Sequence, residues 1–146
     1  MPVVPPDIVP FEPAHHGAAL ALWRRCEGIG LSRADEADAI AGFLQRNPGT
    51  SFAAFDGARL VGTILVGHDG RRGLIHHLAV EPAARGRGLA RQLVRHGLQA
   101  LRACGIGKCH LLVQADNAGA RRFWQAVQAE HRQTLVVYSL SLDGPA

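Results

Sequence analysis

The sequence predicts an α/β fold in which a mixed, mostly antiparallel central sheet is flanked by helices. Apolar runs of strand length alternate along the chain with runs whose apolar residues recur at helical spacing. The turn signals Asp56-Gly57 and Asp69-Gly70 join three successive strands into an antiparallel meander. A glycine-rich turn then leads from the third of these strands into a helix. The predicted element order is β-α-α-β-β-β-α-β-α-β.

The first predicted elements are a strand over residues 7–11 and two helices. Pro13 suits the first turn of a helix, because the N–H that proline lacks would have no helical acceptor there. Ser32 and Asp35, three residues later, are typical of a capping box with Asp in place of Glu at the start of the second helix. Asn47-Pro48-Gly49 ends that helix, because a residue before proline avoids the helical conformation.

The meander consists of residues 50–55, residues 58–67 and residues 74–80. After it, residues 89–101 carry leucines along one helical face. Three elements complete the chain: a strand over 110–115, a short helix over 119–128 that Asp116-Asn117 caps, and a last strand over 133–142, rich in Val, Thr and Tyr.

Length and composition indicate a soluble globular protein. The chain has 146 residues, 47% of them hydrophobic and 19% charged, and no apolar stretch approaches the ~20 residues of a membrane helix. The N-terminus lacks the pattern of a signal peptide. Cys26, Cys104 and Cys109 are an odd number without framework spacing, which favours reduced thiols. We therefore expect a cytoplasmic protein without a membrane partner.

The basic charge balance, +4 with a pI near 9.6, raises the question of nucleic-acid binding. Three arginine pairs are scattered along the chain, and only Arg85, Arg87, Arg91 and Arg95 gather around one element. Such a local cluster suits a small, multiply charged ligand better than a long polyanion. We expect no nucleic-acid partner.

The most informative segment is Arg85-Gly86-Arg87-Gly88-Leu89-Ala90, at the predicted junction of strand and helix. The first turn of a helix leaves backbone N–H groups without acceptors, and glycine allows a ligand to approach the backbone closely. The segment predicts a site for an anion such as a pyrophosphate. The alternative is that the glycines merely form a tight turn.

Two familiar nucleotide-binding motifs do not fit this segment. The third glycine of the dinucleotide fingerprint is missing, and Lys108 stands where a ribose-binding carboxylate would lie. The Gly-x4-Gly-Lys-[Ser/Thr] string of a P-loop does not occur in the chain. The meander before the turn is also unlike a doubly wound nucleotide-binding fold.

The segment resembles the GNAT superfamily of N-acetyltransferases. Arg85, Gly88 and Ala90 match its Arg/Gln-x-x-Gly-x-Gly/Ala signature, and Leu78-Ala79-Val80-Glu81-Pro82 looks like the preceding strand of that family. Weaker likenesses are Phe11-Glu12-Pro13-Ala14-His15, Val61-Gly62 and Asp116-Asn117. The resemblance implies a single GNAT-like N-acetyltransferase domain over residues 1–146.

The resemblance also implies acetyl-CoA as cosubstrate. In the family, the loop amides hold the coenzyme pyrophosphate, the strand backbone binds the pantetheine, and an asparagine contacts the pantetheine arm. The implied coenzyme-binding residues here are Leu78, Ala79, Val80, Arg85, Gly86, Arg87, Gly88, Leu89, Ala90, Arg91, Asn117 and Trp124. The arginines suit phosphates because their planar guanidinium groups make paired hydrogen bonds. The histidines show no zinc-site spacing, so we expect no metal.

His76 and His77 are the candidate catalytic residues. An alkyl amine with a pKa of ~10 must lose a proton before it attacks a thioester, and imidazole suits this task. Neighbouring strand residues point to opposite faces, so we expect at most one of the two to face the site. Some family members place a histidine at the position of His76, which ranks first, before His77 and Glu81. The alternative is that both histidines are packing or surface residues.

The general acid is the point at which the chain departs from the family. Many members carry a tyrosine seven residues after the asparagine, whereas this chain has Trp124, whose indole is no practical proton source. Trp124 then packs beside the coenzyme, and Tyr138 is a distant second candidate for the acid. Two functions stay open: an N-acetyltransferase for a small-molecule or protein amine, and a catalytically weak CoA-binding regulatory module.

Asp35, Glu36 and Asp38 begin the second predicted helix, in a region that borders the acceptor site in the family. They either attract a cationic amine or serve as ordinary complements of the helix dipole. The acceptor, the acyl chain length and the oligomeric state, monomer or homodimer, stay open.

Overall fold

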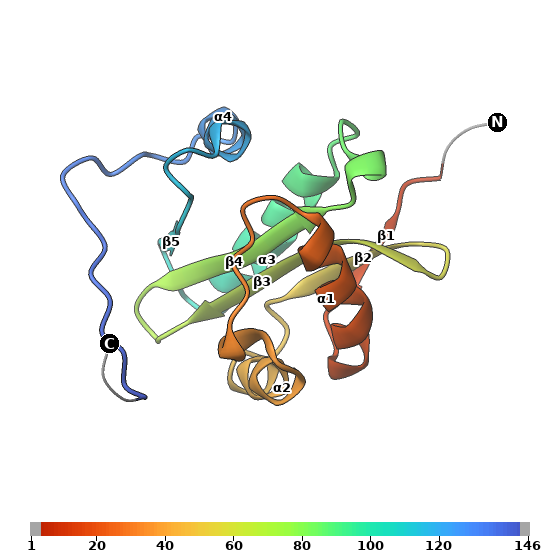
Figure 1. The fold of residues 1–146 in the computed structure, drawn as a ribbon, viewed down its shortest axis with the longest axis horizontal. Helices are drawn as coiled ribbons and strands as arrows, with labels where there is room; N and C mark the ends of the chain where they lie inside the picture. Colours follow the sequence, from red (N-terminus) through yellow and green to blue (C-terminus); the bar gives the residue numbers. More distant parts are fainter. Residues whose placement is uncertain (1–3, 144–146) are drawn as a thin grey trace. The chain divides into compact units, whose positions relative to one another are not determined.

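The computed structural model describes residues 4–143. The chain divides after Gln114 into two compact units, which we call the sheet unit (up to Gln114) and the C-terminal unit (from Ala115). Each is described by itself. Figure 1 shows their elements along the chain.

The sheet unit contains a five-stranded sheet in the order β1-β2-β3-β4-β5. The first four strands are antiparallel neighbours, and β5 runs parallel to β4. This arrangement confirms the predicted mixed, mostly antiparallel sheet and its meander. The strands are β1 (Asp7–Pro10), β2 (Phe52–Asp56), β3 (Arg59–His68), β4 (Gly73–Val80) and β5 (Cys109–Leu111).

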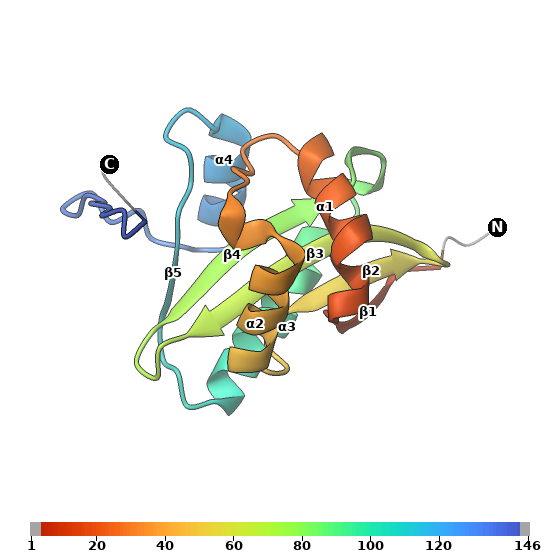
Figure 2. The ribbon, with the colours of Figure 1, turned by 60° about the horizontal axis from the view of Figure 1, so that its bottom comes forward.

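Helices cover both faces of this sheet. Figure 2 shows α1 and α2 in front of the sheet and α3 behind it. The α-helices are α1 (His16–Arg25), α2 (Ala37–Arg46) and α3 (Leu89–Ala103), with short 3-10 turns η1 (Pro13–His15), η2 (Arg33–Asp35) and η3 (Pro82–Ala84).

β3 is buried along most of its length because both of its faces are covered. Leu65 belongs to the same buried cluster as Leu22 and Trp23 of α1. The side chains of Ile64 and Val66 point instead toward Gly97 of α3. The alternation of side chains along a strand thus supplies both halves of the core.

The predicted capping box is present, but it caps the 3-10 turn η2 instead of the helix α2. The Ser32 hydroxyl accepts from the Ala34 N–H, and the Ser32 N–H donates to the Asp35 carboxylate. These bonds cap η2, and α2 begins later, at Ala37. Glu36 lies between them in extended backbone, so one predicted helix is observed as a short turn and a separate helix.

The C-terminal unit contains α4 (Ala118–Ala126), which begins as predicted at Asn117. The predicted strand over residues 133–142 is wrong, because no strand follows α4 within the described residues. Its apolar side chains, such as Val136 and Tyr138, are exposed. An alternating apolar pattern favours extended backbone, but a strand exists only where a second backbone pairs with it. The predicted strand over 110–115 is also shorter, ending at Leu111.

The close approach of α3 to β3 requires a small residue at position 97. A Cβ at Gly97 would lie 2.9 Å from Cγ2 of Val66. We expect Gly97→Leu to lower the free energy of unfolding by about 1–3 kcal/mol through overpacking. Gly42→Leu on α2 is the matched control, because a Cβ there meets nothing within 4 Å. It should leave stability unchanged or raise it by up to about 0.8 kcal/mol. Urea denaturation measures both, and equal effects would contradict the packing assignment.

Candidate active site

β4 contains a β-bulge at the two candidate catalytic histidines. Thr63 of β3 pairs with Ala79, whereas Leu65 pairs with His76. Two residues of β4, His77 and Leu78, therefore lie opposite one residue of β3. His77 adopts the left-handed conformation with φ 47°, which is rare for a residue with a side chain.

The bulge places both imidazoles on the α1/α2 face of the sheet. The His76 ring lies 6.1 Å from the ring of Phe43 on α2, and the His77 ring lies 4.7 Å from that of Trp23 on α1. The centroids of the two imidazoles are 6.5 Å apart. The prediction that they point to opposite faces is wrong, because the extra residue interrupts the alternation of the strand.

His77 is fixed by its side chain and by its backbone. Its Nε2 lies 2.6 Å from Oδ1 of Asp35 in η2. Its carbonyl accepts a hydrogen bond of 2.8 Å from the Thr63 hydroxyl, which itself accepts from Nε1 of Trp23 at 2.9 Å. His77 is thus hydrogen-bonded to β3 and η2 directly, and to α1 through the Thr63 hydroxyl.

Asp35 is a buried member of this cluster, so its carboxylate is not an exposed attractor of amines. Its Oδ2 accepts from the Ser32 N–H at 2.9 Å. Nε2 of His16 lies 2.7 Å from its backbone carbonyl, and because a carbonyl only accepts, the imidazole is the donor. Sequence spacing missed this role, since 42 residues separate Asp35 from His77.

His76 is the histidine whose protonation the fold disfavours. Burial lowers its pKa below the usual histidine value, the neighbouring His77 lowers the pKa further, and Asp35 opposes both effects. Its ring is therefore neutral near neutral pH and able to accept a proton.

One edge of β4 is open beside the bulge. β3 pairs with β4 as far as Val80, but β5 pairs only with Gly73, Leu74 and Ile75. Residues 76–80 thus have a neighbouring strand on one side only within the described chain. The backbone of an open strand edge is a ready partner for an extended ligand that carries amide groups.

The glycine-rich turn follows this open edge. Gly86 and Gly88 have φ values of 82° and 80°, and a Cβ on either would meet nothing within 4 Å. Gly88 directly precedes α3, whose first-turn N–H groups lack helical acceptors. Arg87 and Arg91 are exposed around the turn. Arg85 is exposed too, but its Nε donates to the Val80 carbonyl at 3.0 Å and so braces the start of the turn.

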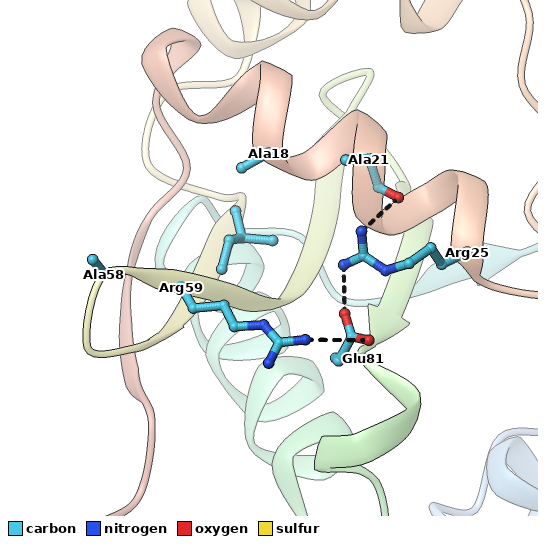
Figure 3. A pocket seen from close by; sticks show the side chains of 7 residues that line it. Ala18, Ala21, Arg25, Ala58, Arg59 and Glu81 are labelled. Carbon is cyan, nitrogen blue, oxygen red and sulfur yellow. Dashed lines mark hydrogen bonds and ion pairs between the residues drawn. The ribbon is translucent and has the colours of Figure 1, made fainter.

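Glu81, a lower-ranked candidate base, is held in an ion-pair cluster. Its buried carboxylate lies 2.5 Å from Nη2 of Arg25 and 3.6 Å from Nη2 of Arg59 (Figure 3). Because both carboxylate oxygens have an arginine partner, an anchoring role between β4 and η3 is favoured over proton transfer. The surrounding hollow is lined by Ala18, Ala21, Arg25, Ala58, Arg59, Leu60 and Glu81.

The candidates in the C-terminal unit have local partners. Oδ1 of Asn117 accepts from the Ala120 N–H at 3.0 Å and caps α4. The half-buried ring of Trp124 lies 5.1 Å from that of Phe123, and Tyr138 is exposed. Among residues 4–143, no three His, Cys, Asp or Glu side chains gather as metal ligands, and no helix could cross a membrane.

Comparison with known proteins agrees with this geometry. Residues 17–128 match the model of the acetyltransferase (GNAT) family. The chain belongs to this family. An acetyltransferase of Pectobacterium atrosepticum is 33% identical over 113 residues, which cover 77% of this chain and 79% of that protein. An acetyltransferase of Photorhabdus laumondii is 34% identical over 124 residues, covering 84% and 86%. The predicted family and enzyme class are confirmed: this GNAT protein is an acetyltransferase.

Solved structures show the same fold. An acetyltransferase from Streptococcus agalactiae superposes with a TM-score of 0.74 at 18% identity, covering 94% of this chain and 92% of that one. AAC(6')-Iy, in complex with the bisubstrate analogue CoA-S-monomethyl-acetylneamine, has a TM-score of 0.74 at 19% identity, covering 93% and 98%.

The lowered pKa of His76 makes stability depend on pH. Between this pKa and the ordinary value of ~6.5, the unfolded chain binds more protons than the folded chain, so the contribution of His76 to the free energy of unfolding is lost as pH falls through this window. His76→Gln removes the contribution. We expect the unsubstituted protein to lose more stability than His76→Gln between about pH 7.5 and about pH 5, measured by urea denaturation. Parallel pH profiles would contradict this expectation.

Proposed function

We propose that this GNAT protein is a cytoplasmic, acetyl-CoA-dependent N-acetyltransferase that moves an acetyl group from the thioester to a primary amine. The open edge of β4, leading directly into the glycine turn, carries the proposal. We treat residues 1–146 as one catalytic domain, since the family match at residues 17–128 extends into both compact units.

The glycine turn is the proposed pyrophosphate site. Backbone N–H groups of residues 86–91 bind the phosphate oxygens, and Arg87 and Arg91 add positive charge. The open space at Gly86 and Gly88 supports this assignment, because a phosphate can reach the backbone there. Leu78, Ala79 and Val80 supply the strand backbone for the pantetheine. The roles of Asn117 and Trp124 toward the coenzyme rest on the resemblance alone.

His76 and His77 are the proposed catalytic pair. Both rings lie on the same face at the bulge, and neither Nδ1 nor Nε2 of His76 has a hydrogen-bond partner in the described chain. A neutral imidazole takes a proton from the substrate ammonium, which frees the amine lone pair for attack. With a pKa near the cysteine value of ~8.5, the departing thiol is an acceptable leaving group without a tyrosine acid.

The acceptor is proposed only as a primary amine, of a small molecule or of a protein. Structural relatives fall on both sides of this choice. AAC(6')-Iy was captured with an acetylneamine analogue, and the ribosomal-protein-S18-alanine N-acetyltransferase of Escherichia coli has a TM-score of 0.68 at 19% identity.

Thiol release from acetyl-CoA with a panel of amines tests the proposed reaction. The panel should include polyamines, aminoglycosides, amino acids and peptides with free N-termini or lysines. With the best acceptor, we expect His76→Ala and His77→Ala each to lower kcat by about 100-fold, the usual contribution of a general base. His110→Ala, on the exposed part of β5, is the control. If CoA binds but no amine accelerates thiol release, the proposed reaction is wrong and the chain acts as a CoA-binding module.

Gly88→Glu tests the pyrophosphate site. A carboxylate in the turn repels the phosphates, so we expect affinity for CoA to fall at least about tenfold. Gly70→Glu is the matched control: Gly70 also has a positive φ, 90°, and open space around it, but it lies in the β3–β4 turn. Both variants should lose similar stability, and only Gly88→Glu should lose affinity in calorimetry. Unchanged affinity of Gly88→Glu would overturn the assignment.

A further inference from the structure

Asp35 and His77 are in contact, and each is unusual: Asp35 is a buried carboxylate, and His77 has a strained backbone. His77 has a left-handed backbone with φ 47°, a strained conformation that persists only where its surroundings enforce it. Its side chain is 15% exposed, and that of Asp35 is 10% exposed. An observed backbone outlier of this kind, facing a buried carboxylate, points to a functional constraint.

We propose that Asp35 is a positioning residue that holds the proton of His77 on Nε2, so that Nδ1 is the atom that accepts the proton of the substrate amine. This inference rests on the proposed acetyltransferase reaction. It adds a third role for Asp35 to the two that its sequence position suggests, attraction of an amine and complement of the helix dipole.

The hydrogen-bond pattern around Asp35 fixes the tautomer. An ionised carboxylate only accepts hydrogen bonds, so Nε2 of His77, 2.6 Å from Oδ1, is the donor. Nδ1 is then unprotonated in the neutral ring. It has no partner in the described chain, and no described side-chain nitrogen is both buried and unpaired, so Nδ1 reaches solvent. The imidazole is therefore anchored at one nitrogen and open at the other.

Asp35 is itself held from three directions. The Ser32 N–H bonds Oδ2, His16 of α1 bonds the backbone carbonyl, and His77 of β4 bonds Oδ1. With both carboxylate oxygens occupied, the group cannot rotate freely. Its orientation toward His77 is thus set before any substrate binds, and preorganised groups of this kind are most effective in catalysis.

The proposed reaction begins with the transfer of a proton from the substrate to His77. The substrate ammonium gives one proton to Nδ1 of His77, and the imidazolium formed keeps its Nε2–H on the Asp35 carboxylate. The amine nitrogen then bonds to the thioester carbonyl carbon, the C–S bond breaks, and its electron pair leaves with sulfur. The second amine proton passes to the thiolate or to water. Nδ1 finally returns its proton to solvent.

Asp35→Asn reverses the tautomer without removing the contact. The Ser32 N–H needs an acceptor, so it orients the amide with its oxygen toward Ser32 and its NH2 group toward Nε2 of His77. An NH2 group donates, which favours an unprotonated Nε2 and a protonated Nδ1. Asp56→Asn, at the exposed β2–β3 turn, is the control for loss of one negative charge.

Nitrogen NMR of the imidazole rings measures this tautomer without substrate. In two-bond proton–nitrogen spectra, protonated and bare ring nitrogens of neutral histidine are well separated, and His77→Gln identifies the signals. We expect a protonated Nε2 in the unsubstituted protein and in Asp56→Asn, and a protonated Nδ1 in Asp35→Asn. A protonated Nδ1 in the neutral ring of the unsubstituted protein overturns the proposal, whether or not the variant folds.

Kinetics tests the consequence. With the best acceptor, Asp35→Asn should lower kcat at least about tenfold with little change in KM for acetyl-CoA. Placed on His77→Ala, it should have almost no further effect, because the two residues act as a unit. In the unsubstituted protein, we expect kcat/KM to fall at acidic pH because His77 must be unprotonated to act as the base. In Asp35→Asn, this fall should be absent. The charged and titratable groups around His77 are Asp35, His76 and His16, so His76→Gln is run in parallel to assign the fall.

The outcomes separate this inference from the proposed function. If no amine accelerates thiol release, the acetyl-transfer proposal fails, while the NMR spectra still decide the tautomer. If transfer occurs and Asp35→Asn switches the tautomer with kcat unchanged, Asp35 is not a positioning residue. Additive losses in the Asp35→Asn, His77→Ala double variant contradict the proposal as well.

Discussion

The Thr63 hydroxyl is the point on which the candidate site depends. It accepts a hydrogen bond from Trp23 of α1 and donates one to the carbonyl of His77 in β4, so a single buried group joins a helix, a central strand and the bulge. A buried hydroxyl with both bonds satisfied is stabilising, whereas the loss of one partner leaves a costly unpaired group. The packing of Trp23 and the conformation of His77 are therefore coupled. The hydrophobic core and the candidate site meet at the Thr63 hydroxyl.

Around this contact, β4 carries two distinct structural features. The α1/α2 face carries the imidazole pair and the buried carboxylate of Asp35. The open edge and the glycine turn offer backbone atoms instead of side chains to the proposed coenzyme. Arg85 and the Glu81 ion-pair cluster brace the junction between them. The proposed binding of the coenzyme and the proposed proton transfer thus involve different atoms of the same strand.

Features set by neighbours in the chain were predictable from the sequence. Asp56-Gly57, the two glycines of the turn before α3 and the Asn117 cap act within a few residues, and the structure has the hairpin, the turn and the cap that they predict. The contact of Asp35 with His77 spans 42 residues and requires a bulge that no periodicity reveals. The prediction of a strand over residues 133–142 is wrong for a related reason. Val136 and Tyr138 favour extended backbone, but a strand also requires a second backbone with which to pair. Turns and helix caps can therefore be predicted from a single sequence, whereas strand pairing and contacts between distant residues cannot.

The bulge also makes the site sensitive to the deletion of a single residue in β4. Removal of a single residue at positions 77–78 would restore a regular ladder between β3 and β4 and relieve a left-handed backbone. Such a deletion mutant would have the more regular sheet, yet one histidine would be lost from the shared face or turned to the other one. Selection for stability alone would tend to erase this irregularity. The number of residues between the β3–β4 turn and the glycine turn therefore decides whether both imidazoles lie on one face of the sheet.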